Sequence, residues 1–262
     1  MKESKYFLGI PLSIALLTDI HNNSYVNIIK DLNMNNPDII CIAGDVIHGY
    51  QNIDDGLITS TQENVLPLLI ECSKIAPTFM SLGNHEWMLT HEDTEQIRST
   101  GVYLLDNEWT EYKGIYIGGQ TSAYVKWYRE IRKKLNEEDK SHELYIDPKL
   151  LKDGKNYIPP KKSLPDTSWL TGFASVSGYK ILLCHHPEYY SFIPDEINLV
   201  LSGHAHGGQV RLFNHGLYAP GQGWFPKYTS GVYDNKLVVS KGLSNTAEVP
   251  RIFNSTEIVY IY

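Results

Sequence analysis

Short apolar runs, each followed at once by polar side chains, are the strongest pattern along the chain. They are rich in Ile, Leu and Val and are bounded by glycine or polar residues. Runs of this length and composition predict buried strands of an α/β sheet. The predicted strands are residues 14–17, 39–43, 78–82, 181–184 and 199–201.

Apolar residues at helical spacing predict three helices between these strands, at residues 23–33, 63–75 and 91–99. Pro67 lies near the start of the second helix, where a missing backbone N–H is tolerated. Thr90 is the predicted N-cap of the third, with Asp93 as an acidic residue at N3. Further on, Lys113-Gly114 predicts a hairpin whose second strand ends at Gly118-Gly119.

The stretch from about 122 to 168 is the least regular part of the chain. It begins with a predicted amphipathic helix, residues 124–135, with a basic face, and continues as a polar segment, residues 136–162, that contains three prolines. Too little apolar material remains there to build a second core. We therefore predict a single domain over residues 1–262, with an insertion or cap at about 122–168. This segment either covers one side of the functional site or is a solvated basic face packed on the domain.

Length, composition and net charge limit the classes of protein to which the chain can belong. A length of 262 residues, with 42% hydrophobic and 20% charged residues, suits one large globular α/β domain. The net charge of -7 argues against a general nucleic-acid binder, which would carry a basic stripe. Phosphate substrates remain compatible with this charge, because bound cations supply local positive charge.

The cysteines and the apolar run near the amino terminus indicate the cellular compartment of the protein. Cys41, Cys72 and Cys184 lack metal-type spacing and are predicted to be reduced core residues of a cytoplasmic protein. Residues 6–17 resemble the core of a signal peptide, but residues 14–17 are needed as the first strand. No other apolar run approaches the roughly 20 residues of a membrane helix, so no transmembrane segment is expected.

Each predicted strand leads into a block of metal-binding residue types. Because the strands end near one another in an open α/β fold, these side chains collect at one edge of the sheet. The sequence therefore predicts a metal site built from five loops. The blocks are Asp19-Ile20-His21, Gly44-Asp45-Val46-Ile47-His48, Gly83-Asn84-His85-Glu86, His185-His186 and Gly203-His204-Ala205-His206.

In order and spacing the blocks resemble the calcineurin-like metallophosphoesterase superfamily, whose signature runs D-x-H, G-D-x-x, G-N-H-[DE], H and G-H-x-H. The resemblance extends from Leu12 to about Ile261, and residues 203–209, 218–223 and 225–228 are similar to its YkuE/YaeI-type branch. It implies an α/β fold with a central β-sandwich of mixed sheets flanked by helices, and a dinuclear metal site at the strand ends.

The resemblance also implies two divalent metal ions. Mixed imidazole, carboxylate and amide ligands suit Mn, Fe or Zn, and manganese is favoured. Asp45 would bridge the ions, because its two oxygens can reach both. The implied ligands are Asp19, His21, Asp45 and His206 for one metal, and Asp45, Asn84, His185 and His204 for the other.

The paired histidines are harder to assign from the residues alone. Directly after a strand, His185 and His186 face opposite ways, so only one should bind metal. The family pattern selects His185, with His186 as the alternative. His204 and His206 alternate by two and face the same side, as two ligands would, although a pair of ordinary buried histidines would show the same spacing.

The resemblance gives His85 the catalytic position. There it contacts the substrate phosphate beside Asn84 and protonates the leaving oxygen, a task that suits an imidazole. Two residues depart from the pattern. His48 stands where protein phosphatases have the aspartate that orients the catalytic histidine, so the orienting partner of His85 is left open. Glu86 replaces the commoner aspartate.

The implied activity is hydrolysis of a phosphodiester, pyrophosphate or phosphomonoester by a hydroxide bridging the two metals. The alternatives are a UDP-acylglucosamine-type pyrophosphatase of the same branch and a non-catalytic scaffold that retains the fold. The expected partner is a phosphoester substrate, either a small molecule or lipid-linked, and no nucleic acid. Peripheral membrane contact stays open, because relatives in this branch are often membrane-associated.

Overall fold

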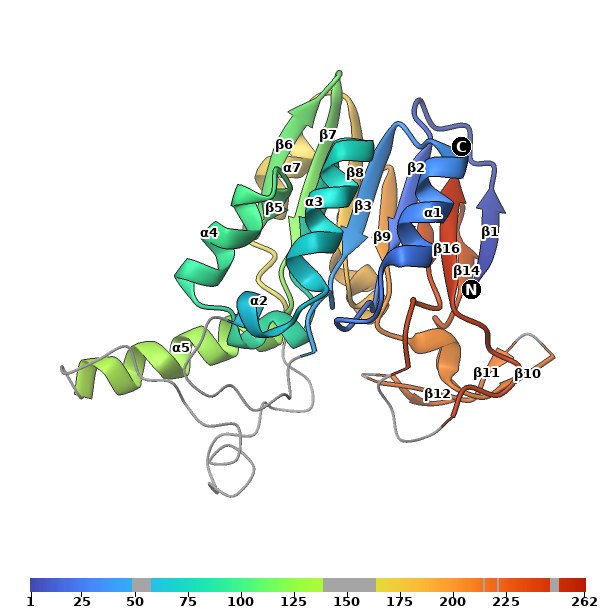
Figure 1. Ribbon diagram of the computed structural model, residues 1–262. Helices are drawn as coiled ribbons and strands as arrows, with labels where there is room; N and C mark the ends of the chain where they lie inside the picture. Colours follow the sequence, from blue (N-terminus) through green and yellow to red (C-terminus); the bar gives the residue numbers. More distant parts are fainter. Residues whose placement is uncertain (49–57, 139–163, 214, 221, 246–249) are drawn as a thin grey trace.

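The computed structural model describes residues 1–262 except 49–57, 139–163, 214, 221 and 246–249 (Figure 1). Two six-stranded sheets form its centre. In spatial order the first sheet contains β1 (Lys2–Tyr6), β16 (Glu257–Ile261), β2 (Ile14–Leu17), β3 (Ile39–Ala43), β4 (Thr78–Ser81) and β5 (Tyr103–Leu105). The second contains β14 (Gly231–Tyr233), β15 (Leu237–Val239), β9 (Leu199–Ser202), β8 (Tyr179–Cys184), β7 (Ile115–Gln120) and β6 (Glu108–Tyr112).

Strand direction brings the candidate blocks to one edge. β2, β3, β4 and β5 are parallel neighbours in the first sheet. β7, β8, β9 and β15 are parallel neighbours in the second. Both sheets also contain antiparallel pairs, β16 with β2 in the first and β6 with β7 in the second. The prediction of an α/β fold with mixed sheets is confirmed.

The inner strands β2, β3, β4 and β9 are buried on both faces, which explains their nearly continuous apolar runs. In β2, Ile14 and Leu16 belong to a cluster that also contains Ile181 and Leu183 from the second sheet. The alternate residues Ala15 and Leu17 belong to a cluster with the helices. The period of two along a strand thus divides each run between two layers of the core.

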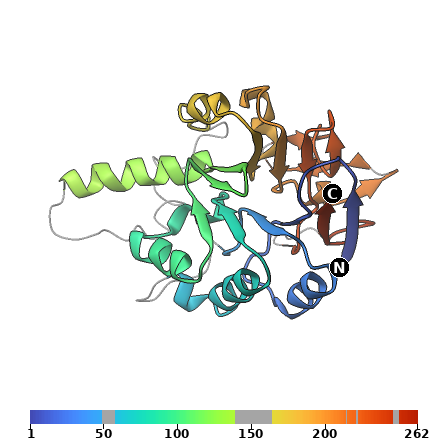
Figure 2. The same cartoon turned by 90° about the horizontal axis from the view of Figure 1, so that it is seen from above.

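Helices cover both outer faces (Figure 2). α1 (Val26–Asn35), α3 (Val65–Ile75) and α4 (His91–Ser99) pack on the first sheet through their buried apolar residues. α7 (Leu170–Ser175) and the 3-10 helix η2 (Pro187–Phe192) pack on the second. Thr90 and Asp93 form the predicted capping box of α4, and the expected helices and strands are present with small shifts at their ends.

Further helical elements lie near the carboxyl ends of the central strands. They are α2 (Ile58–Thr61), η1 (His85–Met88), α5 (Ala123–Glu138) and η3 (His206–Gly208). Two small hairpins follow η3, one of β10 (Arg211–Leu212) with β11 (His215–Gly216) and one of β12 (Tyr218–Ala219) with β13 (Gly223–Trp224).

Some of the remaining predictions are confirmed, and others fall on residues that the structure does not describe. Residues 14–17 do form an inner strand, and Cys41, Cys72 and Cys184 are buried free thiols. β1 and β16 are elements that the sequence pattern did not predict. The predicted helix at 124–135 is present as α5, but most of the polar segment after it, including 139–163, lies outside the described residues. None of the helices in the described ranges is both long and apolar enough to cross a bilayer.

Candidate metal centre

The loops after β2, β3, β4, β8 and β9 converge at one end of the sandwich. They form two adjoining groups of metal-binding side chains, and within each group the ligand atoms lie within 4.8 Å of one another. Imidazole Nε2 atoms from both groups approach Asp19 and Asp45. The groups are Asp19 with His21 and His206, and Asp45 with His185 and His204.

Backbone carbonyls fix the orientation of two of these imidazoles. Nδ1–H of His21 donates to the carbonyl oxygen of Ile47 at 3.2 Å, and Nδ1–H of His185 donates to that of Ala43 at 2.7 Å. Since a carbonyl only accepts, Nδ1 of each ring carries a hydrogen, and Nε2 is the nitrogen turned towards the carboxylates and available to a metal. For His185, a metal at Nε2 would have to displace the proton that Asp45 favours there.

Asp45 is the common neighbour of both groups. Its Oδ1 accepts the backbone N–H of His85 at 2.9 Å. Its Oδ2 lies 3.7 Å from Nε2 of His21 and 3.0 Å from Nε2 of His185. One carboxylate oxygen of Asp45 thus faces both groups, and the other holds a neighbouring loop.

The backbone at these residues is left-handed. Asp19, His21, Asp45, His204 and His206 have φ values of 52°, 50°, 56°, 63° and 45°. This region is sparsely populated by residues other than glycine, although Asp, Asn and His enter it most readily. Each such residue stores about 1 kcal/mol or more of strain, which persists only where the surroundings fix the conformation.

Two glycines permit the close approach of the loops. A methyl group at Gly83 would overlap the carboxylate of Asp45, and one at Gly203 would lie 2.6 Å from Oδ2 of Asp19. Neither glycine has a positive φ. Their role is therefore the close contact of backbone with a buried carboxylate, and any larger residue would displace that carboxylate.

Glu86 ties the loop after β3 to the loop after β4. Its fully buried carboxylate accepts backbone N–H groups from Gly83 at 2.7 Å, Asp45 at 2.9 Å, Val46 at 2.8 Å and Ile47 at 3.2 Å. Burial and the charge of Asp45 raise the pKa of Glu86 to about 7, while the N–H donors favour the ionised carboxylate. One side chain thus sets the positions of both Asp45 and Asn84.

The residues fit a bound divalent cation. Nε2 of His21, Nε2 of His185 and Oδ1 of Asn84 are buried, and none has a hydrogen-bond partner in the described part of the chain. Buried polar atoms are rarely left unsatisfied. Imidazole nitrogens, carboxylates and an amide oxygen that converge in this way match the ligand preferences of Mn, Fe or Zn.

Comparison with known proteins agrees with this geometry. The family model described as calcineurin-like phosphoesterase matches residues 12–208, well over half of the chain. The chain belongs to the calcineurin-like phosphoesterase family.

Its relatives include "Putative metallophosphoesterase F40B5.2" of Caenorhabditis elegans, 26% identical over 95% of this chain and 48% of the relative. "Uncharacterized metallophosphoesterase YkuE" of Bacillus subtilis is 26% identical over 94% of this chain and 76% of its own length. "Phosphodiesterase YaeI" of Escherichia coli is 27% identical over 77% of this chain and 63% of its own length. The chain thus spans about half the length of the worm relative, and 58% of the length of a Campylobacter jejuni relative.

The site carries strongly shifted pKa values. Burial alone would raise the pKa of Asp45, but the positive charge available on His185 and His85 lowers it well below its ordinary value. Burial lowers the pKa of His185, but the negative charge of Asp45 has the larger effect and raises this pKa to about 10. The carboxylates therefore create a negative potential at His185 strong enough to hold a cation, here a proton on the imidazole.

His186 lies beside the second group, where its ring centroid is 4.1 Å from that of His204, and it forms a further cluster of metal-binding types with Glu188 and His204. Its Nε2 lies 2.8 Å from Oγ of Ser122 and its Nδ1 lies 3.2 Å from Oε1 of Glu188, so both ring nitrogens have side-chain partners. The ring of Tyr124 stacks on it with an interplanar angle of 4°. His186 thus anchors the start of α5 beside the site, whereas Nε2 of His185 faces Asp45.

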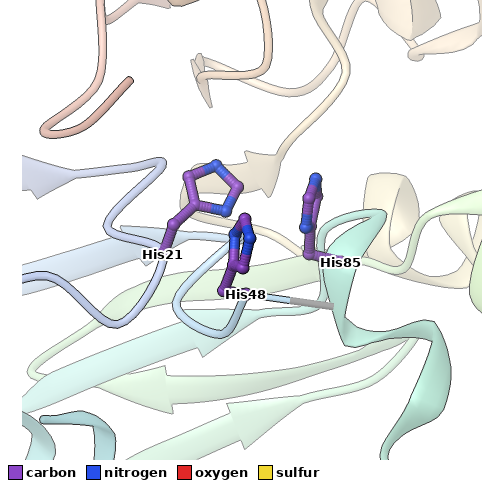
Figure 3. A group of neighbouring side chains, drawn as sticks. All are labelled: His21, His48 and His85. Atoms are coloured by element: carbon purple, nitrogen blue, oxygen red, sulfur yellow. The ribbon is translucent and has the colours of Figure 1, made fainter. Parts of the chain in front are cut away.

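His85 lies at the start of η1, next to Asp45 and two other histidines. Figure 3 shows His21, His48 and His85 projecting from three separate loops towards the same side. Nε2 of His85 is 3.9 Å from Oδ2 of Asp45, and its ring lies 4.4 Å from that of His21 and 5.9 Å from that of His48. His48 is positioned by Gln62, which bonds both its backbone N–H and its carbonyl oxygen.

Arg251 is a site residue that the sequence did not reveal. Its Nη2 donates to the carbonyl oxygen of Ser244 and, at 3.1 Å, to Nδ1 of His206. Its Nε and Nη1 are buried without a hydrogen-bond partner among the described residues. Because a guanidinium only donates, Nδ1 of His206 accepts, so Nε2 carries the hydrogen. A cation at that Nε2 requires the hydrogen to move to Nδ1 and Arg251 to turn away.

Asn254 is a second such residue. Its Nδ2 donates to the carbonyl oxygens of His206 at 2.7 Å and of Gln209 at 3.0 Å. These bonds fix the backbone of η3, and with it that of His206, a candidate metal ligand. No motif marks either residue, because Asn254 and Arg251 are more than forty positions from His206 in the chain.

Replacing Glu86 with glutamine tests the link between the loops. The amide –NH2 would face backbone N–H groups, leaving two donors unpaired, so the free energy of unfolding should fall by about 2 kcal/mol. The measurement is urea denaturation of the EDTA-treated protein at pH 8. Glu71→Gln, at a half-buried glutamate that pairs with Lys74, is the control and should change stability by less than about 0.5 kcal/mol. Equal stability of the two variants would contradict the role of Glu86.

Acid should destabilise the metal-free protein. Burial lowers the pKa of His21 to about 3 and also lowers those of His85 and His204. Their stabilising contribution is present above the unfolded pKa of about 6.5 and is lost as pH falls below it. His185, with a raised pKa, contributes in the opposite sense, fully below pH 6.5 and less as pH rises towards 10.

The three lowered imidazole pKa values outweigh the raised pKa values of His185 and Glu86, so the EDTA-treated protein should lose about 1 to 2 kcal/mol of unfolding free energy between pH 7 and pH 5. Urea denaturation at both values measures the loss, and His21→Asn should lose less because it lacks one of the titrating groups. A denaturation midpoint that does not change with pH would refute this account of the buried imidazoles.

Proposed function

We propose that this chain is a metal-dependent phosphoesterase that holds two divalent cations, with manganese favoured. The proposed ligands are Asp19, His21, Asp45 and His206 for one cation and Asp45, Asn84, His185 and His204 for the other. The observation that carries the proposal is the pair of buried groups around Asp45, with imidazole Nε2 atoms turned inwards and their Nδ1 atoms held by backbone carbonyls. When bound, such cations supply Lewis acidity that polarises a phosphoryl oxygen and acidifies water.

Asp45 orders both halves of the site. Its Oδ2 faces His21 and His185, while its Oδ1 holds the backbone of His85. A substitution at Asp45 should therefore alter the geometry of both groups and the position of His85. Asn84, in the same loop, contributes its unpartnered Oδ1 as a neutral oxygen ligand beside the substrate phosphate.

His85 is proposed to act on the leaving oxygen. Burial lowers its pKa, so its imidazole is neutral at pH 7 and donates a single N–H to the bound phosphate. The negative charge of a bound phosphoester would raise that pKa and favour a protonated His85 that can deliver its proton to the leaving group. Arg251, once turned away from His206, would contribute a positive charge through its unpartnered Nε and Nη1.

The first substrates to test are phosphodiesters. One relative is named a phosphodiesterase, and the chain is similar to it over 77% of its length. A lipid-linked pyrophosphate of the UDP-acylglucosamine type is the second candidate, favoured by exposed aromatic residues close to η3. A scaffold that keeps only the fold is disfavoured, because the candidate ligands are present and converge. We also propose that the enzyme acts in the cytoplasm, consistent with its three reduced cysteines.

The segment at 122–168, proposed as an insertion in a single domain, is anchored by ion pairs where the structure describes it. Lys126 pairs with Asp166 at 3.3 Å, and Arg129 pairs with Asp106 at 2.7 Å. Basic residues engaged in this way support a packing role for the first turns of α5. A role in substrate selection rests instead on the contact of Tyr124 with His186.

Purified protein supplied with manganese should contain about two metal ions per chain by elemental analysis. Asp45→Asn should lower the content at both sites, because it removes the charge shared between them. Asp195→Asn, at an exposed aspartate away from the proposed ligands, is the control and should bind as much metal as wild type. A wild-type protein that retains no metal would overturn the proposal.

His85→Asn should lower turnover of bis-p-nitrophenyl phosphate by roughly 100-fold or more, while the metal content stays normal. Diesters with an alkoxide leaving group should lose more activity, because a poor leaving group depends more on protonation. Steady-state kinetics on both classes of ester measures the difference. Equal losses on the two classes would assign His85 to phosphate positioning and exclude the acid role.

A further inference from the structure

Exposed apolar side chains concentrate on the loops that follow η3. Phe213 is 96% exposed, Phe253 84%, Phe225 81% and Trp224 73%. Large apolar residues at this exposure are unusual on a soluble surface when they lie together. We call the set the aromatic loop surface, and it comprises Leu212, Phe213, Tyr218, Trp224, Phe225, Ile252 and Phe253.

Backbone hydrogen bonds join these loops into one unit. Leu217 N–H donates to the carbonyl oxygens of Gly208 and Val210, and Phe225 N–H donates to that of Leu217. Arg211 N–H donates to the carbonyl oxygen of Ile252, which brings the carboxyl-terminal loop alongside. The exposed side chains are thus presented by a fixed framework, visible around β10, β11 and β12 in Figure 1.

This unit is continuous with the candidate metal centre. Gly208, whose carbonyl anchors Leu217, ends the 3-10 helix that begins at His206. Arg251, which donates to His206, immediately precedes Ile252 and Phe253. Whatever covers the aromatic loop surface therefore lies next to the site.

The charge of the segment differs from that of the whole chain. The protein carries a net charge of -7, yet no aspartate or glutamate occurs from Ile197 to Tyr233. The same stretch carries Arg211 and Lys227, and Lys227 is exposed. Most of the aromatic tips thus lie on a stretch whose sequence has no carboxylates and has a basic residue at its border, and such a stretch complements an anionic lipid surface.

We propose that the aromatic loop surface inserts into the headgroup region of a phospholipid bilayer and holds the metal centre at the membrane surface. Trp224 and Tyr218, whose rings lie 5.5 Å apart, are residue types that favour this interface. The phenylalanines at the loop tips enter the apolar layer. A protein partner would require a packed complementary face, whereas fluid lipid accommodates separate projecting side chains.

Membrane insertion does not depend on the enzymatic proposal, but its consequence for substrate choice does rest on it. If the chain hydrolyses phosphoesters, a surface-docked site next to η3 would take its substrate from the membrane, as a phosphoester or pyrophosphate linked to a lipid. Water-soluble esters would then be cleaved without any need for the aromatic loop surface.

Co-sedimentation of the full chain with vesicles tests the proposal. The vesicles contain equal parts phosphatidylcholine and phosphatidylglycerol. Wild-type protein should partition onto them, and the triple variant Phe213→Ser, Phe225→Ser, Phe253→Ser should bind at least about 100-fold more weakly, since the loss scales with apolar area removed. Lys227→Glu should weaken binding to these vesicles more than binding to pure phosphatidylcholine.

Phe7→Ser is the matched control, because Phe7 is 79% exposed but lies between β1 and β2. It should bind vesicles within about two-fold of wild type, since binding follows the apolar area of the aromatic loop surface alone. The proposal fails if wild-type protein stays in the supernatant, if the triple variant binds equally, or if Phe7→Ser loses as much.

Two further measurements separate the alternatives. If wild-type protein is oligomeric without lipid and the triple variant is monomeric in size-exclusion chromatography, the surface joins two copies of the chain and the membrane proposal is overturned. Hydrolysis of bis-p-nitrophenyl phosphate should be equal in wild type and triple variant. Vesicle binding without hydrolysis would refute the enzymatic proposal alone, and hydrolysis without vesicle binding would refute the membrane proposal alone.

Discussion

The buried carboxylate of Glu86 collects four backbone N–H groups from two loops, and the rest of the site is arranged around that contact. It fixes the backbone of Asp45, and Asp45 in turn faces imidazoles delivered by both sheets. An uncompensated buried carboxylate would be unfavourable, but four donors satisfy it. The substitution of glutamate for the aspartate commoner in the family therefore changes a structural contact between loops.

The site combines strain and charge that would each destabilise a protein without function. Left-handed backbone at Asp19, His21, Asp45, His204 and His206 carries a conformational cost. Two carboxylates buried side by side carry an electrostatic one. Both costs are concentrated at the strand ends, while the sheets behind them are filled with ordinary apolar packing. That separation suits a rigid scaffold that bears a strained metal-binding edge.

The strands and most helices were predictable because burial on two faces imposes continuous apolar runs on the sequence. The residues of the metal centre were predictable in identity, since they follow those runs directly. Their orientation was not, because the tautomers of His21 and His185 depend on carbonyl oxygens that belong to other loops. Arg251 and Asn254 were not predicted for a related reason. They contact His206 only in the folded structure, and no sequence motif marks an arginine or asparagine in a loop as part of a site. β1 was missed because it is an edge strand of mostly polar, exposed residues, whereas β16 has the apolar run of a buried inner strand but no metal-binding block after it to draw attention.

The pairing of β16 between β1 and β2 has a consequence for how the chain is made. Ile14 lies in register with Ile261, so one of the longest loops in the chain must close before the first sheet is continuous. Until residues 257–261 leave the ribosome, β2 exposes the edge that β16 later covers, although Asp19 and Asp45 are synthesised early. The nascent chain therefore holds its metal-binding loops on an unfinished sheet, a state in which unpaired strand edges invite misassociation. The sheet that supports the site is therefore complete only after β16 has paired with β2.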